Sequence, residues 1–191
     1  MKRRTAVKRL SLLAGGVLLS LGGIKYYQLH KVPDLSLLDK YRVLLGDLSD
    51  TIIPASDSPG AKEVEVGDFV IKMVRDCTSR MSQNNFITGL KDLAGHAESK
   101  YGKPYGQCTV QERINILSHF EKAAKPFSRW MGKVENKVEG DPFFVTLKNY
   151  VVLGYCTSKP GATQALRYDF IPGKYTGVVT LAPGQRAWAT E

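Results

Sequence analysis

Apolar side chains recur at three- and four-residue intervals along most of the chain between residues 37 and 155. This spacing places them on one face of an α-helix, which must bury that face against a neighbour. In the segment of residues 37–53, Asp47 falls outside the apolar stripe and is expected on another face of the helix. The intervals fall into segments at residues 37–53, 63–77 and 84–101, and then from residues 110 and 142 onward. The sequence therefore predicts a mainly α-helical domain of about five helices over residues 37–158.

Helix boundaries in this domain are marked by residues with known capping roles. Pro54 ends the first helix, because proline lacks the backbone N–H that a helix interior needs. Thr109 and Glu112 form a capping box at the start of the fourth helix. Asp141 followed by Pro142 predicts an acidic N-cap with proline in the first helical position. The side chains expected to be buried in the second and fourth helices are Val66, Phe69, Val70, Met73 and Cys77, and Val110, Ile114, Leu117 and Phe120.

Residues 159–191 have a different character. They contain several prolines and glycines and show no helical period past Leu166. This composition predicts an extended C-terminal tail, with a short strand at residues 175–181 where valines favour extension. The tail aromatics must lie either against the helices of this chain or against a partner: they are Tyr168, Phe170, Tyr175 and Trp188.

Residues 1–24 have the layout of an export signal, a basic head followed by a short apolar run. The run is shorter than the roughly 20 apolar residues that span a bilayer. Arg3 and Arg4, followed by Lys8, resemble the twin-arginine signal of a route that exports folded proteins. An ordinary basic signal for the unfolded chain is the alternative. The leader is either cleaved after Gly22 or retained as an anchor, and residues 25–36 form a linker. These features predict a periplasmic, membrane-associated protein.

The positive charge of the chain is concentrated in this leader. The formal net charge is +9, and residues 1–30 hold six basic and no acidic side chains. The remaining residues carry 21 basic and 18 acidic side chains, so the folded part is nearly balanced. This balance argues against nucleic-acid binding, which requires a strongly basic surface.

The sequence contains none of the motifs that hold common cofactors. It lacks Gly-x-Gly-x-x-Gly after a strand, a Walker loop, a Gly-x-Ser-x-Gly elbow and Cys-x-x-Cys-His. His30, His96 and His119 are scattered, with no metal-ligand spacing to one another or to a cysteine. We therefore expect no catalytic, cofactor-binding or metal-binding residue in this chain.

Three cysteines remain for an oxidising compartment: Cys77, Cys108 and Cys156. The odd number allows one internal disulfide and a leftover thiol, or a disulfide to another chain. Cys77 and Cys156 lie on or beside predicted apolar stripes, so burial as small hydrophobic residues is the simpler interpretation.

Two stretches of the chain together resemble a known family. The first closes the first helix with Asp50-Thr-Ile-Ile-Pro-Ala-Ser-Asp-Ser-Pro-Gly-Ala61, and the second runs from Gly154 to Gly177. With the leader, they resemble gluconate 2-dehydrogenase subunit 3, the small subunit of membrane-associated flavin-dependent dehydrogenases. The resemblance implies a large subunit, similar to glucose-methanol-choline oxidoreductases, that holds FAD and oxidises the sugar or sugar acid. It also implies a haem-carrying cytochrome subunit in many cases.

The resemblance implies that the small subunit is not catalytic alone. It would bind the large subunit in the cytoplasm and lend it the leader for the twin-arginine export machinery. We expect the motif loop and the tail to contact the partner, while Asp57 also bonds nearby amides in an Asx-type turn. The expected contacts are Asp57, Pro59, Tyr168, Tyr175 and Trp188. Two alternatives are a free-standing, membrane-tethered periplasmic binding or scaffold protein and a small enzyme with an unfamiliar site.

Overall fold

The fold is known from a computed structural model, which describes residues 23, 27–124, 139–171, 173, 177–178, 180–181 and 183–189. The leader residues Arg3, Arg4 and Lys8 and the tail residue Tyr175 lie outside these ranges. The described chain is mainly helical, which confirms the predicted fold class. Its elements are α2 (Ser36–Lys40), α3 (Arg42–Ile52), α4 (Val66–Cys77), α5 (Arg80–Tyr101), the 3-10 turn η1 (Tyr105–Gln107), α6 (Val110–Ala123), α8 (Phe143–Thr157) and the π-helical turn η2 (Gly161–Ala165).

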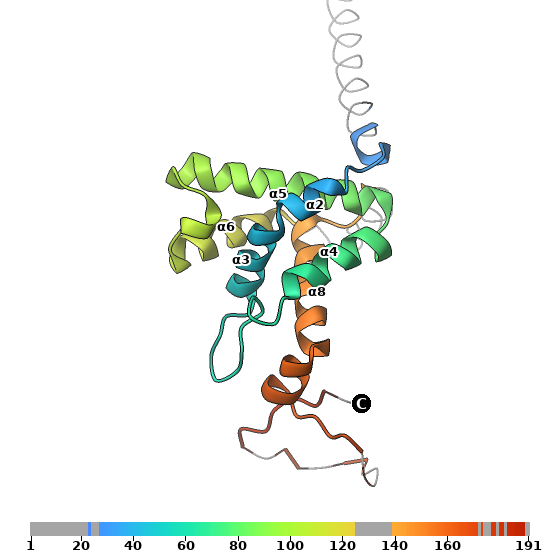
Figure 1. The fold of residues 1–191 in the computed structure, drawn as a ribbon, viewed down its shortest axis with the longest axis vertical. Helices are drawn as coiled ribbons and strands as arrows, with labels where there is room; N and C mark the ends of the chain where they lie inside the picture. Colours follow the sequence, from blue (N-terminus) through green and yellow to red (C-terminus); the bar gives the residue numbers. More distant parts are fainter. Residues whose placement is uncertain are drawn as a thin grey trace, which may run out of the picture.

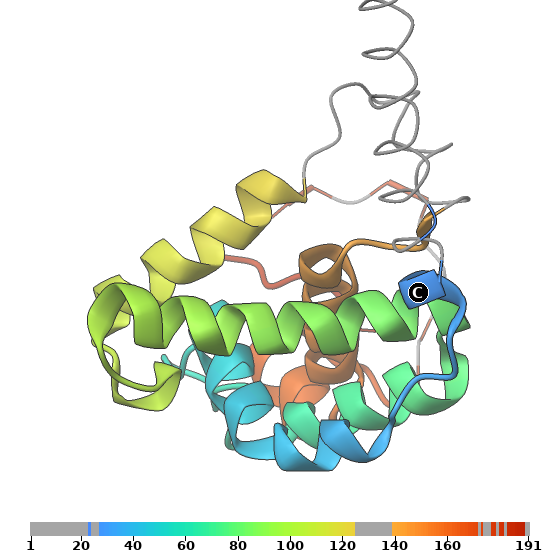
Figure 2. The same ribbon diagram turned by 90° about the horizontal axis from the view of Figure 1, so that it is seen from above.

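Helix α8 is the centre of the arrangement. It packs against α4 on one side and α5 on another, while α3 packs against α4. Figure 1 shows α5 running across the upper part of the molecule and α8 descending from it; the view from above shows α8 nearly end-on behind α5 (Figure 2). The Phe86 and Phe143 rings meet where α5 and α8 cross, with centroids 5.3 Å apart. The largest fully buried side chains come from all the main helices: Leu38, Leu45, Leu48, Val66, Val70, Val74, Phe86, Leu90, Leu93, Ile116, Leu147 and Val151.

The helix boundaries agree with the sequence where local capping decides them. The capping box is confirmed: Thr109 Oγ1 accepts a hydrogen bond from Glu112 N, and Glu112 Oε2 accepts one from Thr109 N at 2.7 Å. The predicted acidic N-cap of α8 is wrong, because Pro142 occupies the N-cap position and no side chain caps the helix. The backbone N–H of Asp141 instead donates to Ser82 Oγ on α5 at 2.9 Å.

Burial differs from the predicted stripes in two helices. Helix α4 buries Val66 and Val70 as expected, but its deepest side also includes Gly67, Ile71 and Val74 and leaves Cys77 exposed. Helix α6 buries Ile116 and Leu117 and exposes two residues of its predicted stripe, Val110 and Ile114. Helix α4 packs between α3 and α8 and is covered on two sides. Its buried residues therefore do not form the single stripe that the sequence predicts.

The first predicted helix is interrupted at Tyr41, which separates α2 from α3. Its apolar stripe still points inward, with Leu38, Leu45 and Leu48 fully buried. Asp47 was expected outside this stripe but is buried, with a relative exposure of 6%. The reason is an ion pair, since Lys62 Nζ lies 2.6 Å from Asp47 Oδ1.

Two separate segments are tied to the start of α5. Residues 27–30, in the region expected as a linker, are helical and Leu29 is buried. Asn84 Nδ2 donates to the carbonyl oxygens of Leu29 and Lys31, both at 2.9 Å. Asn85 Nδ2 donates to the Glu139 carbonyl oxygen at 2.8 Å. The chain that follows the leader is therefore fastened to the folded domain.

The tail leaves η2 and folds back on itself. Arg167 and Trp188 form an isolated parallel bridge, in which Arg167 N donates to Ala187 O at 2.8 Å and Ala189 N donates to Arg167 O at 2.9 Å. The described residues of the expected strand, 177–178 and 180–181, are not in a strand. That expectation is wrong for them, since no segment among the described residues pairs with their backbone. Within the described ranges, none of the helices combines the length and apolar character needed to cross a bilayer.

Candidate partner-binding surface

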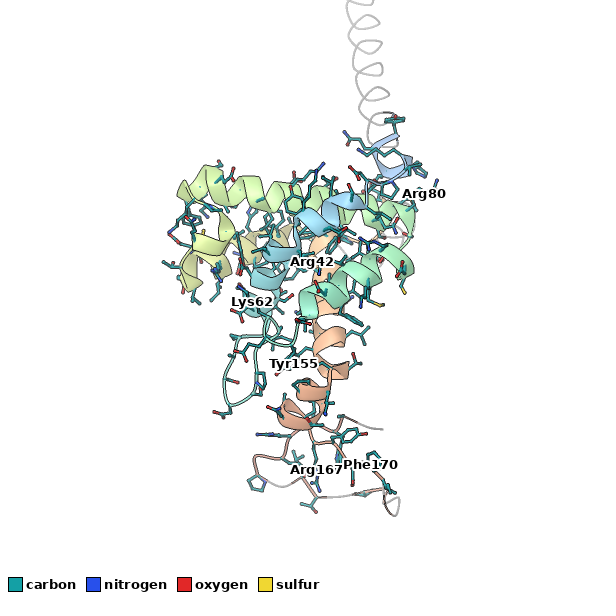
Figure 3. All side chains as sticks on the ribbon, in the orientation of Figure 1. Arg42, Lys62, Arg80, Tyr155, Arg167 and Phe170 are labelled. Atoms are coloured by element: carbon teal, nitrogen blue, oxygen red, sulfur yellow. The ribbon has the colours of Figure 1, made fainter. Side chains whose placement is uncertain are left out.

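The two sequence motifs that carry the resemblance meet in space. The first motif forms a loop over residues 54–60, closed by a hydrogen bond from Ala61 N to Ile53 O at 2.9 Å. Tyr155, in the second motif, donates its hydroxyl to the Pro59 carbonyl oxygen at 2.8 Å and lies 3.1 Å from Ser58 Oγ. Figure 3 shows Tyr155 on α8, beside this loop. A tyrosine of the central helix thus holds the motif loop in place.

The loop itself is built differently from the expected Asx-type turn. Its turn is formed by Ser56 N donating to Ser58 O at 3.0 Å. Among the described residues, none forms a hydrogen bond with the exposed Asp57 side chain, so the predicted bonds from Asp57 to nearby amides are wrong. Gly60 is required at the loop end, because a Cβ there would lie 2.8 Å from Ala55 N. Asp57 is therefore presented to solvent, with Pro59 half-buried behind it.

Glycines shape the second motif where α8 turns into η2. A Cβ on Gly154 would lie 2.5 Å from the Phe69 ring, so this glycine lets α4 and α8 approach closely. A Cβ on Gly161 would overlap the Tyr155 carbonyl oxygen. Ser158 Oγ accepts a hydrogen bond from Gly161 N at 3.0 Å and donates one to Tyr155 O at 2.7 Å. This tight turn sets the direction in which the tail leaves α8.

The tail is fastened by its own aromatic and basic side chains. The Arg167 guanidinium lies over the Trp188 ring, 4.2 Å from its centroid, in a cation–π contact. Arg186 Nη1 donates to the Gln164 carbonyl oxygen in η2. Trp188 therefore packs within the tail, yet its side chain and that of Tyr168 remain about half exposed, at 47% and 45%.

Exposed apolar side chains are concentrated in this part of the molecule. Phe170 is 82% exposed, and the outward side of α8 presents Val152 and Leu153. The remaining large exposed hydrophobic residues of the tail are Ile171, Val178 and Leu181. Sequence reasoning selected the tail aromatics and placed Val178 and Leu181 in the expected strand, but it did not identify these residues or Ile171 as exposed apolar surface. It also did not identify the α8 pair, because the buried face of α8 depends on its neighbours.

The three cysteines are all free thiols in the structure. Cys77 is exposed, so its predicted burial is wrong, whereas Cys108 is buried and Cys156 is half-buried. Burial raises the pKa of the Cys108 thiol. A disulfide from Cys77 or Cys156 to another chain stays a prediction.

Two histidines that are distant in sequence are brought together by the packing of α5 and α6. The imidazoles of His96 and His119 stack with centroids 4.6 Å apart and an interplanar angle of 7°. His96 Nε2 is buried without a hydrogen-bond partner among the described residues. Burial, and then the neighbouring His119 and Lys100, lower the pKa of His96. The described ranges contain no cluster of three or more side chains arranged to hold a metal ion.

Comparisons with known proteins gave one result. The chain matches the model of the family "Gluconate 2-dehydrogenase subunit 3" over residues 39–173. No curated protein and no solved structure matched. The matched range covers the helical domain, the motif loop, the turn after α8 and the start of the tail. Because this match spans more than half of the chain, the protein belongs to the gluconate 2-dehydrogenase subunit 3 family.

Proposed function

We propose that this protein is the non-catalytic small subunit of an oxidoreductase complex, which binds a flavin-dependent catalytic subunit and escorts it across the inner membrane. The catalytic subunit is of the glucose-methanol-choline type, carries FAD, and oxidises gluconate, another sugar or an alcohol. A haem-containing cytochrome subunit completes the complex and passes electrons onward. The complex works in the periplasm, associated with the membrane.

The observation that carries this proposal is the family match over residues 39–173, since the family is named as a subunit of gluconate 2-dehydrogenase. The chain also exposes large apolar side chains on its tail, as a subunit with a protein partner does. The leader, with Arg3, Arg4 and Lys8, supports the escort function. It resembles a twin-arginine signal, and that export route accepts folded, cofactor-loaded passengers.

The test is co-expression of the full chain with its flavoprotein, followed by cell fractionation. We expect flavin and dehydrogenase activity in the periplasmic and membrane fractions. The double substitution Arg3→Lys with Arg4→Lys should leave both subunits in the cytoplasm, while Lys8→Arg, a conservative control in the same leader, should not. The purified small subunit alone should contain no flavin.

Export of the flavoprotein that is unchanged by the double arginine substitution would contradict the escort. A monomeric small subunit that never co-purifies with the flavoprotein would favour the free-standing scaffold protein instead.

A further inference from the structure

The outward side of α8 exposes two large apolar side chains beside the polar residues Lys148, Asn149 and Thr157. Its inward side chains Leu147, Val151 and Tyr155 are buried, but Val152 and Leu153 on the opposite side are 41% and 44% exposed. In this chain, α4 and α5 cover one part of α8, and the outward side remains open.

The tail adds two exposed apolar side chains beyond the end of α8. Phe170 and Ile171 are 82% and 74% exposed. Figure 3 places Phe170 beside Arg167, at the end of the molecule where α8 and η2 terminate. We call the surface formed by Val152, Leu153, Phe170 and Ile171 the C-terminal pole. Large exposed apolar side chains are typical of surfaces that a partner covers.

The segment of the chain that forms the C-terminal pole is predominantly basic. Residues 143–189 contain five basic side chains and a single acidic one, Asp169. Residues 31–142 contain 16 basic and 16 acidic side chains. The positive excess of the folded part therefore lies in the segment that forms the pole. Its described basic members are Lys148, Lys159, Arg167 and Arg186, all at the surface.

The C-terminal pole lies at the opposite end of the described molecule from residues 27–31, which follow the leader in sequence. Residues 27–31 are tied to Asn84 at the start of α5, and Figure 1 shows them at the top and the tail at the bottom. Helix α8 runs between the two ends, and its 15 residues span about 22 Å. A protein bound at the pole would leave residues 27–31, the described residues next to the leader in sequence, uncovered.

We propose that the catalytic subunit docks on the C-terminal pole. The surface by which the catalytic subunit binds would be apolar at its centre and acidic at its rim. This inference rests on the proposed function and adds the face of contact and the chemistry of the partner surface. The basic side chains of the pole favour a partner surface with a carboxylate-rich rim, because opposite charges across an interface speed association and exclude wrong partners. An anionic membrane is the rival occupant. It is disfavoured because the basic and apolar side chains are divided between a helix and an extended tail, whereas a membrane-surface segment usually carries both on one amphipathic helix.

The first arm of the test removes the apolar centre. The full chain, affinity-tagged, is titrated against its purified glucose-methanol-choline-type flavoprotein. The double variant Leu153→Ser with Phe170→Ser should weaken binding by about 30-fold or more, because central apolar contacts dominate interface energies. The matched control is Val43→Ser with Val110→Ser. These valines are 73% and 72% exposed, on α3 and at the start of α6, and their loss should change the affinity by less than about 3-fold.

The second arm reverses the basic rim. Lys148→Glu with Lys159→Glu should weaken binding by about 10-fold at low salt, and the loss should shrink at high salt because the charges are screened. Lys72→Glu with Lys91→Glu, on exposed parts of α4 and α5, makes the same change in net charge away from the pole. This control should bind like the wild type. Hydrogen exchange of the unmodified complex provides an independent readout, with added protection expected at residues 148–171 and not at residues 91–101.

The outcomes separate the two proposals. A wild-type chain that binds no flavoprotein overturns the proposed function and this inference with it. Binding that is equally strong in the pole variants and the controls, without protection at residues 148–171, overturns the inference alone. If the pole variants still bind the flavoprotein but no longer bind phosphatidylglycerol vesicles, the pole contacts a membrane. That result also overturns the inference that the catalytic subunit docks there.

Discussion

The hydroxyl of Tyr155 donates a hydrogen bond to the carbonyl oxygen of Pro59 at 2.8 Å, joining residues that are 96 positions apart. Tyr155 belongs to the central helix, and Pro59 to the loop of the other family motif. The ring of Tyr155 is buried in the core, so the position of its hydroxyl is fixed by the packing around the ring. The motif loop is therefore positioned by the core.

Replacing this hydroxyl tests its contribution. Tyr155→Phe removes the donor and leaves the Pro59 carbonyl oxygen without that partner, so we expect a loss of about 1–2 kcal/mol in the free energy of unfolding. The loop at residues 54–60 should also become more sensitive to limited proteolysis. Tyr27→Phe, at an exposed tyrosine, is the control and should change stability by less than about 0.5 kcal/mol. Urea denaturation measures both. Equal stability of the two variants would show that the hydrogen bond is not needed.

Two glycine substitutions should act in opposite directions. Gly161→Ala forces a Cβ onto the Tyr155 carbonyl oxygen, and we expect a loss of about 2 kcal/mol or more because backbone must shift. Gly95→Ala lies within α5 with no atom within 4 Å of the new Cβ. It should stabilise the protein by up to about 1 kcal/mol, since alanine favours a helix over glycine. Thermal unfolding of the two variants is the measurement, and a Gly161→Ala protein as stable as the wild type would contradict the tight turn.

The ion pair between Lys62 and Asp47 should matter more than the ion pairs at the surface. Lys62→Met leaves the buried carboxylate of Asp47 unpaired, so we expect a loss of about 1–3 kcal/mol, below the value for a fully buried pair because Lys62 is half exposed. Arg75→Met breaks the exposed pair with Asp39 and should cost less than about 1 kcal/mol. The double variant Asp47→Asn with Lys62→Met should recover part of the loss. Chemical denaturation of all three variants tests the ranking.

The stacked histidines predict a dependence of stability on pH. Burial holds the pKa of His96 below its ordinary value of 6.5, with smaller contributions from His119 and Lys100. The unfolded chain therefore takes up a proton at a higher pH than the folded protein does. Stability should be complete above pH 6.5 and decrease as the pH falls through and below that value. His96→Gln should flatten this part of the profile. Melting temperatures between about pH 5 and 8 provide the check, and identical profiles for the two proteins would refute the assignment.

Local sequence signals predicted what local interactions decide. Thr109 and Glu112 are three residues apart, and their capping box is present because it needs nothing beyond one helical turn. Pro54 follows the last turn of α3 as expected. The acidic cap at Asp141 is absent because α8 begins one residue later than expected, with Pro142 as its N-cap. Asp47 was expected outside the stripe of its helix, and in the structure it is buried with its carboxylate paired to Lys62, which is distant in sequence.

The amino-acid sequence by itself determined the helical class, the positions of most helices and the family, because periodicity, caps and motifs are written in short stretches of chain. The tertiary structure decided which face of each helix is buried, since α4 and α8 each pack against several neighbours at once. It also decided that Tyr155 meets Pro59 and that His96 meets His119. The exposed apolar side of α8 belongs to this second group. A stripe of apolar residues in the sequence does not indicate how many neighbouring helices will cover it. Only the tertiary structure shows which part of the helix surface remains exposed.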